Sequence, residues 1–248
     1  MLLICNNKPF CHFSQGLGFL VKSLWNSIFH AMFIGHVGAA FAAKRFAPRT
    51  SLGTLVFATG FLDLIWPIFL IFGVEHVRIA PGITRVTPFD FYDYPISHSL
   101  LAVVGWSLVV GLGYFAVRRY RRDAWIVGLG VLSHWFLDWV VHRPDLTLWP
   151  GAKARYGLGL WNSLSATLAV EGAVFAIGLW LYRRETRPTN RVGTWALLSF
   201  VAFLVFAWMG AMFGGPPPGE KSMAWGGLSL WLIPVWAAWA DRHRTSRA

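Results

Sequence analysis

Long apolar runs, separated by short polar segments, follow one another along almost the whole chain. The apolar core of a bilayer is about 30 Å thick, so a helix needs roughly 20 mostly apolar residues to cross it. The runs have that length, and they predict about seven membrane-spanning helices. We place them near residues 24–43, 51–73, 96–117, 124–142, 158–182, 193–213 and 224–240. The pattern therefore predicts an all-α, polytopic bundle of transmembrane helices.

Most prolines fall between these segments, where they interrupt no helix. Pro67 and Pro234 are the two that lie inside predicted spans. A proline inside a membrane helix usually marks a kink that packs against neighbouring helices. Because Pro67 follows Asp63 by one helical turn, we expect a kink at Pro67 to open space beside that carboxylate.

Composition agrees with a membrane protein and leaves no room for a separate soluble domain. The chain has 248 residues, of which 56% are hydrophobic and 13% charged. Its net charge of +11 could indicate nucleic-acid binding, but the basic residues gather in every second predicted loop and at the end of the chain. The positive-inside rule places these loops, and the C-terminus, in the cytoplasm. Topology therefore explains the charge, and we expect no nucleic-acid partner.

The remaining loops, 74–95, 143–157 and 214–223, then face the outside, which in a bacterium is the periplasm. The first is the longest and is rich in hydrogen-bonding side chains, as at the mouth of a site. These are Glu75, His76, Asp90, Tyr92, Asp93 and Tyr94. Taken alone, Glu75 and His76 are better interpreted as solvated loop residues.

Several ionisable residues lie inside the predicted spans or at their ends. Each costs several kcal/mol in a bilayer unless it is paired or faces a wet cavity, so such residues indicate function. They are His36, Asp63, His98, His134, Asp138, His142 and Glu171. A single pair of this kind is explained as well by a hydrogen bond between helices, but a set spread over five spans favours a polar functional cavity.

The strongest local pattern is Ser133-His134-Trp135-Phe136-Leu137-Asp138, because a spacing of four places His134 and Asp138 on one helical face. His142 extends that face. Imidazole nitrogens and carboxylate oxygens are typical ligands of Zn²⁺ and also bind Mn²⁺. We therefore predict a divalent metal site here, to which His98, Asp63 and Glu171 contribute from neighbouring spans.

Two further residues neighbour this set. Asn162 either hydrogen-bonds a substrate or orients a ligand, or it simply joins helices, as buried asparagines do in membranes. Trp66 is predicted to form part of the cavity wall, as is Trp135.

Several segments resemble the membrane-bound metal-dependent hydrolases, a family of bacterial inner-membrane proteins. They are Met32-Phe33-Ile34-Gly35-His36, Phe61-Leu62-Asp63-Leu64-Ile65-Trp66, Tyr94-Pro95-Ile96-Ser97-His98-Ser99-Leu100, Ser133–Asp138, His142-Arg143-Pro144-Asp145 and Gly157-Leu158-Gly159-Leu160-Trp161-Asn162. The resemblance covers most of residues 32–182. It implies a metal centre near the outer leaflet, at His36, Asp63, His98, His134 and Asp138.

The element His134-x-x-x-Asp138 is also loosely similar to zinc-dependent phospholipase C, which suggests a phosphoester or lipid substrate. The resemblance divides the chain into three parts. Residues 1–31 are an N-terminal extension, 32–182 the membrane domain with the site, and 183–248 two more spans and a basic cytoplasmic tail. Because Met32 opens the resemblance, the natural start of the protein is predicted to be there. A peptide from residues 1–31, found by mass spectrometry of the native protein, would exclude that start.

These observations predict an inner-membrane hydrolase in which a metal-activated water attacks an ester or phosphoester presented from the outer leaflet. We expect His98, His134, Asp138 and Asp63 as ligands, His36 as a ligand or a donor to one, and Glu171 or Asp90 as the general base. His142, Asn162 and Trp66 are expected to contact substrate or orient ligands.

Two other classes of protein remain open from the sequence. One is a transporter or permease whose histidines and carboxylates relay protons or carry a metal ion. The other is a structural or assembly protein, in which replacing His134 or Asp138 changes folding and no chemical activity.

Overall fold

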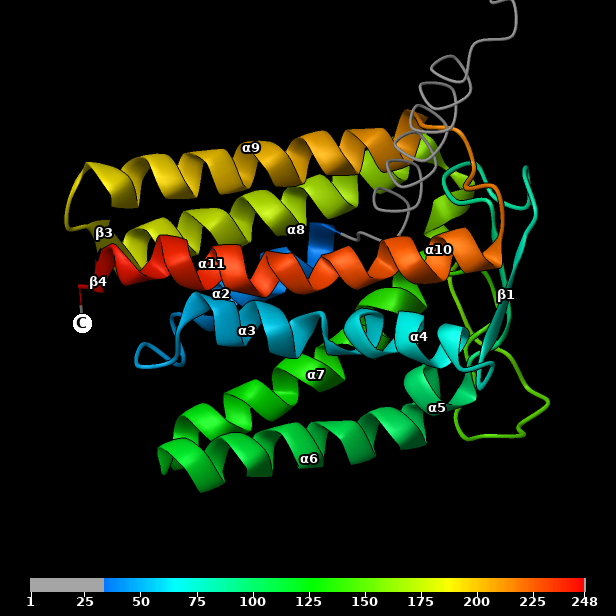
Figure 1. Ribbon diagram of the computed structural model, residues 1–248, viewed down its shortest axis with the longest axis horizontal. Helices are drawn as coiled ribbons and strands as arrows, with labels where there is room; N and C mark the ends of the chain where they lie inside the picture. Colours follow the sequence, from blue (N-terminus) through cyan, green and yellow to red (C-terminus); the bar gives the residue numbers. More distant parts are fainter. Residues whose placement is uncertain (1–33, 248) are drawn as a thin grey trace, which may run out of the picture.

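The computed structural model describes residues 34–247 and shows a bundle of long helices (Figure 1). The predicted N-terminal extension, and residues 24–33 of the first predicted span, lie outside the described residues. Five helical segments of the described chain are long and apolar enough to cross a membrane. They are α6 (Leu100–Arg118), α7 (Arg121–Val141), α8 (Leu164–Glu185), α9 (Arg191–Phe213) and Glu220–Arg242, which joins α10 (Glu220–Gly227), η2 (Leu228–Trp231) and α11 (Leu232–Arg242). The all-α membrane fold is thus confirmed.

The predicted number of about seven spans is too high for the described residues. A sixth crossing is possible if α3 (Leu52–Thr59) and α4 (Phe61–Ile71), which are bent by 55° at the break between them, form one span. The described part of the first predicted span is α2 (Ile34–Ala43), with ten residues. Ten helical residues extend only about 15 Å, roughly half the apolar thickness of a bilayer.

The bend in the second predicted span lies at Gly60, before Asp63, and not at Pro67. Gly60 is both the C-cap of α3 and the N-cap of α4, with φ −97° and ψ 5°. Pro67 sits inside α4, where a Cβ added at Gly227 would meet its ring. The break therefore puts Asp63 in the first turn of a new helix.

Helix α2 is held in the bundle by a very close approach to α8. A Cβ added at Gly178 would overlap the carbonyl group of Gly38, and one added at Gly38 would lie 2.8 Å from the Cα of Phe175. Small residues permit such contacts between membrane helices. The position of α2, and of every side chain that it carries, therefore depends on these two glycines.

A β-hairpin that the sequence did not predict covers one end of the bundle (Figure 1). Its strands β1 (His76–Ile79) and β2 (Phe89–Asp93) pair antiparallel, and Phe89 and Phe91 of β2 are buried. The short helices α5 (Pro95–His98) and η1 (Leu160–Asn162) belong to connections at the same end. The strands are too short to stand out among apolar runs of helical length.

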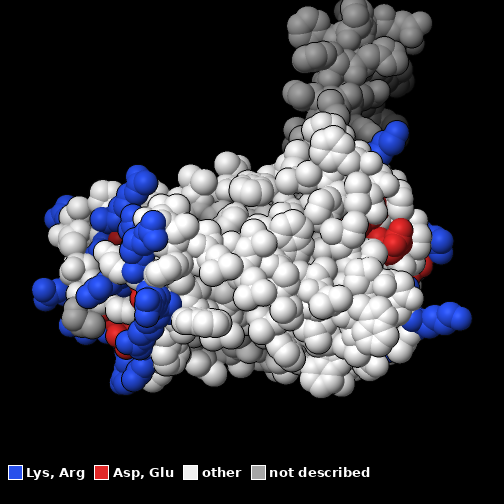
Figure 2. All heavy atoms as spheres, turned by 90° about the horizontal axis from the view of Figure 1, so that it is seen from below, with Lys and Arg blue, Asp and Glu red and all other residues white. Residues whose placement is uncertain are grey.

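The opposite end carries most of the positive charge (Figure 2). There β3 (Thr186–Pro188) pairs with β4 (Arg244–Ser246), against α8, α9 and α11. Between the two ends, the surface drawn in Figure 2 is almost free of charged side chains. Large apolar side chains are exposed along the helices, such as Leu108 and Leu112 of α6 and Trp180 of α8. This is the surface of a multi-pass membrane protein, whose middle contacts lipid.

Candidate metal centre

Six ionisable side chains from distant parts of the chain meet inside the bundle. His134, Asp138 and His142 lie on one face of α7 and its C-terminal cap, at intervals of four residues. The others come from three further helices. They are His36 of α2, Asp63 of α4 and His98 of α5. All are buried except Asp63, whose side chain is 25% exposed.

Asp138 is at the centre of this cluster. Its Oδ1 lies 3.2 Å from Nε2 of His36 and 3.9 Å from Nε2 of His142. Its Oδ2 lies 3.2 Å from Nε2 of His134 and 3.7 Å from Nε2 of His98. Each carboxylate oxygen thus faces two imidazoles.

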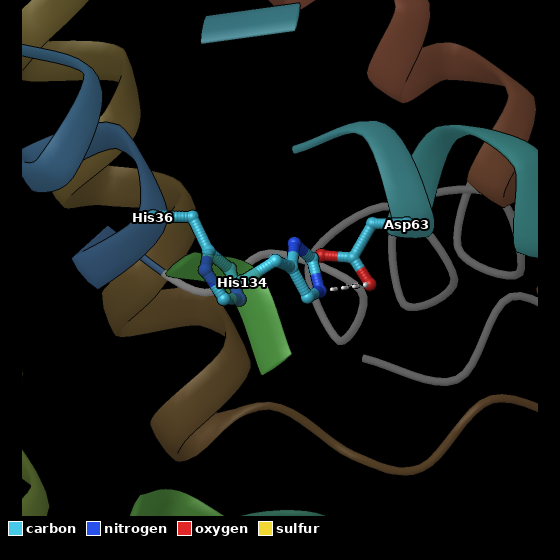
Figure 3. Close-up of side chains that lie close together, drawn as sticks. All are labelled: His36, Asp63 and His134. Atoms are coloured by element: carbon cyan, nitrogen blue, oxygen red, sulfur yellow. Dashed lines mark ion pairs between the residues drawn. The ribbon is translucent and has the colours of Figure 1, made fainter. Parts of the chain in front are cut away.

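Asp63 approaches the cluster from α4. Its Oδ1 lies 3.7 Å from Nε2 of His134 and 3.9 Å from Nε2 of His98. His134 also stacks on His36, with ring centroids 3.7 Å apart (Figure 3). Ligand atoms of His36, Asp63 and His134 all lie within 4.8 Å of one another, as do those of His98, His134 and Asp138. Both trios have the spacing of a metal site.

Three of the four histidines are oriented by a partner at Nδ1. His134 Nδ1 lies 2.7 Å from the carbonyl oxygen of Thr59, and His142 Nδ1 lies 3.0 Å from Oδ1 of Asp145. A carbonyl or carboxylate accepts a hydrogen bond, so each Nδ1 donates, and each Nε2 faces Asp138 and can bind an ion when the ring is neutral. Such an arrangement is typical of histidines that bind metals.

The break at Gly60 supplies one of these partners. In a continuous helix, the carbonyl oxygen of Thr59 would accept a bond from the amide of Asp63. Because α3 ends at Thr59, that oxygen accepts from His134 instead. One break therefore both orients His134 and places Asp63 beside it.

His98 is oriented by Ser97, which is itself held by Glu75, a residue that the sequence predicts to be a solvated loop residue. Glu75 is fully buried, not solvated. It accepts bonds from the backbone amides of Ile96 and Ser97, each at 2.7 Å, and from the Ser97 hydroxyl at 2.6 Å. Since that hydroxyl donates to Glu75, it accepts from His98 Nδ1, which is 2.6 Å away. No local pattern distinguishes Glu75 from a loop residue. The other residue of that pair, His76, has a side chain that is 39% exposed.

Two atoms of the cluster lack hydrogen-bond partners among the described residues. They are Nε2 of His134 and Oδ2 of Asp138, both buried. Buried polar atoms nearly always have a hydrogen-bond partner, and a bound ion is one explanation for an exception. Imidazole nitrogens and carboxylate oxygens are the ligands that zinc and manganese accept. The chemistry of these donors therefore fits the divalent ion that the sequence predicts.

A cavity of about 50 Å³ adjoins the cluster, enough for an ion and a water molecule. Its apolar wall includes Trp66, Phe91, Trp161, Met212 and Met223. Trp66 is buried, and its ring lies 6.4 Å from that of His98, so its predicted position in the wall agrees with the structure.

Glu171 lines the same cavity, and indole groups hold both of its oxygens. Trp161 donates to Oε1 at 3.2 Å and Trp208 donates to Oε2 at 2.8 Å. The carboxyl group is thereby directed by its partners while remaining part of the cavity wall.

The structure does not bring two of the predicted site residues to the cavity. Asp90 on β2 pairs with Arg78 at 3.3 Å and with Arg143, and the cavity lining does not include it. Asn162 is exposed in η1, where its backbone amide donates to Gly159.

Tyr94 supports the cluster from its outer side. Its hydroxyl donates to Oδ1 of Asp145 at 2.8 Å, the same oxygen that holds His142. Burial and the negative charge of Asp145 hold the pKa of Tyr94 well above its usual range. The phenol therefore stays protonated and remains a hydrogen-bond donor.

Part of the chain is similar to a known family. Residues 94–214 match the family model of the YdjM inner membrane protein. The matched segment contains His98, His134, Asp138, His142 and Glu171, while His36 and Asp63 lie before it. No curated protein and no solved structure matches the chain. The match supports an inner-membrane protein, and the description of the family names no activity.

Proposed function

We propose that this protein is a metal-dependent hydrolase of the bacterial inner membrane that acts on an ester or phosphoester. The observation that carries the proposal is the cluster itself. Four imidazole Nε2 atoms and two carboxylates converge beside a cavity, and two of their atoms lack other partners among the described residues. These two atoms face each other at 3.2 Å without a hydrogen bond in the described residues, a spacing that an ion between the donors would use.

The ligands that we propose are His98, His134, Asp138, Asp63 and His36, and the ion zinc or manganese. Such an ion lowers the pKa of a water molecule toward neutrality and polarises the bond to be cleaved. The chain's own part is to hold the donors at fixed positions. The carbonyl oxygen of Thr59 holds His134, and the hydroxyl of Ser97 holds His98, each by a hydrogen bond from the Nδ1 atom of the histidine.

For the general base we propose Glu171. It faces the cavity, and the two indoles keep its carboxyl group in one orientation. The longer of its bonds, 3.2 Å to Trp161, is at Oε1, so that oxygen is the more available to take a proton from water. Asp90, the other predicted base, is engaged with two arginines.

The apolar wall of the cavity suits the acyl or other apolar part of a lipid or small-molecule substrate. Phe91 and Trp161 stand beside His142, with ring centroids 4.8 Å and 4.4 Å away. The positive-inside rule puts the basic end of the bundle in the cytoplasm. On that basis the site opens to the periplasm, and the C-terminus is cytoplasmic.

A transporter or permease is the alternative that the sequence left open. It would need a path from the cluster to the basic end of the bundle. There the fully buried side chains of Phe41, Tyr182 and Phe200 pack together, and Lys44 pairs with Asp241 at 2.8 Å. These contacts favour a site that is accessible from one side.

The test is the metal content of the detergent-purified protein, measured by plasma mass spectrometry. We expect near-stoichiometric zinc or manganese, and its loss in the His134→Ala, Asp138→Ala double variant. The matched control is His243→Ala with Asp93→Ala, which removes the same residue types away from the cluster and should keep the metal. If neither the unchanged protein nor the control variant binds metal after reloading with zinc and manganese, the result would favour a transporter or a structural protein.

A second measurement addresses the reaction. The metal-loaded protein is assayed with bis(p-nitrophenyl) phosphate and with a long-chain p-nitrophenyl ester in mixed micelles. We expect turnover of at least one of them that requires Glu171, and its loss in Glu171→Gln while the metal is retained. Bound metal without turnover of either probe would count against a hydrolase.

A further inference from the structure

We propose that the centre holds two divalent ions bridged by the carboxylate of Asp138. This inference rests on the proposed metal site. It adds the number of ions that the site holds and a role for His142 as a ligand. The number of donors is the first reason. Catalytic zinc is held by about three protein ligands and keeps a position open for water. Six side chains converge here, so a single ion with all of them would have no open position.

The way in which these donors divide is the second reason. Oδ2 of Asp138 faces His134 and His98, and Asp63 approaches the same two histidines. Oδ1 of Asp138 faces His36 and His142. One carboxylate thus has a separate pair of imidazoles at each oxygen. Metals in two-ion centres lie roughly 3.5–4 Å apart, which one carboxylate can span.

The surroundings of His142 are the third reason. Its ring is 4% exposed and lies between Phe91 and Trp161. Asp145 holds Nδ1 at 3.0 Å, and Tyr94 in turn holds Asp145. A carboxylate behind the ring and a free Nε2 in front of it is the arrangement of a metal-binding histidine.

The two sides of Asp138 differ in how far the donors must move. At Oδ2, ligand atoms of His98, His134 and Asp138 already lie within 4.8 Å of one another, whereas at Oδ1 His36 and His142 must draw closer together around an ion. Ligand atoms around a tetrahedral zinc lie roughly 3.3–3.5 Å apart, given bonds of about 2.0–2.1 Å. His36 and His134 already lie 3.2 Å from the Asp138 oxygens. His98 at 3.7 Å and His142 at 3.9 Å need to approach by less than about 1 Å.

The first test is the ratio of zinc to protein after reloading, from plasma mass spectrometry and quantitative amino-acid analysis. We expect about two ions per chain in the unchanged protein and in the control His243→Ala, and about one in His142→Ala. One ion per chain in the unchanged protein would overturn the bridged pair and leave the proposed hydrolase intact. No ion at all would overturn both.

The second test does not depend on counting. Two Mn²⁺ ions that share a carboxylate are magnetically coupled, so the manganese-loaded protein should give an electron paramagnetic resonance spectrum unlike that of isolated Mn²⁺. In His142→Gln, which retains much of the ring's bulk and serves if His142→Ala fails to fold, we expect the isolated-ion spectrum. An isolated-ion spectrum from the fully loaded, unchanged protein would overturn the proposal.

Discussion

The two halves of the bundle both bury charged groups, but they satisfy them differently. At the basic end, Asp241 accepts bonds from Lys44, from the amide of Leu52 and from the hydroxyl of Tyr182, at 2.7–2.9 Å. The remaining contact of Lys44 is the carbonyl oxygen of Thr50. Around Asp138, in contrast, imidazoles approach at 3.2–3.9 Å, and Nε2 of His134 and Oδ2 of Asp138 form no hydrogen bond within the described chain.

The difference teaches how to separate structural from functional polar groups inside a membrane protein. Burial alone does not do so, since Asp241 is 9% exposed and Asp138 is 3% exposed. A saturated network contributes a defined set of helix contacts. A network with unsatisfied atoms, in which several side chains point their ligand atoms at the same small cavity, is arranged to bind an ion or a ligand there.

The largest effect should come from breaking the saturated network. We expect Asp241→Ala to lower the free energy of unfolding by about 3–5 kcal/mol, because Lys44 is left buried and unpaired. Asp138→Asn should lower the stability of chelator-treated protein by much less and should abolish metal binding. Thermal unfolding in detergent, with metal analysis of the folded fraction, measures both. Equal destabilisation by the two variants would remove the distinction between the two regions.

The glycine contact between α2 and α8 links the two regions, since α2 carries His36. We expect Gly178→Ala to cost about 1–3 kcal/mol, because the added methyl group overlaps the Gly38 backbone. Moving α2 should also weaken metal binding. The control is Gly113→Ala on α6, where a Cβ would meet nothing within 4 Å. If both variants unfold at the same temperature, the contact does not hold α2.

A change behind the cluster should alter metal affinity more than stability. Ser97→Ala removes the link between Glu75 and His98, and loss of such a partner typically costs about 10–100-fold in metal affinity. Competition with a zinc chelator measures the change. The matched control is Ser199→Ala, whose hydroxyl bonds only within α9. Unchanged affinity in Ser97→Ala would show that the orientation of His98 does not depend on Ser97.

The smallest effect is expected at Asp90. Its arginine partners are partly exposed, with side-chain exposures of 67% for Arg78 and 32% for Arg143. Ion pairs of this kind contribute about 0–1 kcal/mol to stability. We therefore expect Asp90→Asn to lower the free energy of unfolding by at most about 1 kcal/mol and to keep the metal. Loss of probe hydrolysis with stability and metal retained would identify Asp90 as the general base in place of Glu171.

The sequence predicts the membrane fold and the α7 part of the cluster well, for a physical reason. Apolar length reports a membrane helix directly, and a spacing of four residues reports one helical face. Those rules identify His134 and Asp138 without any tertiary information.

What the sequence could not predict depends on tertiary structure. Glu75 resembles any loop residue until α5 folds onto it, and Asp90 resembles an active-site carboxylate until its arginines are placed. The bend was expected at Pro67 because proline is the commoner cause of a helix kink. A single glycine inside an apolar run does not by itself predict a break in the helix. For the described residues the predicted number of spans was too high, because apolar length does not reveal that a crossing is bent, as α3 and α4 are.

The ion pair between Lys44 and Asp241 has a consequence for how the protein folds during its synthesis. The two residues are 197 positions apart, so Lys44 is synthesised well before its partner. Until Asp241 is made, the lysine lacks its carboxylate partner, and the helices that this ion pair joins are not yet held together. Closure of the basic end of the bundle therefore waits for Asp241, and a chain interrupted before it keeps an open end that quality-control proteases can recognise.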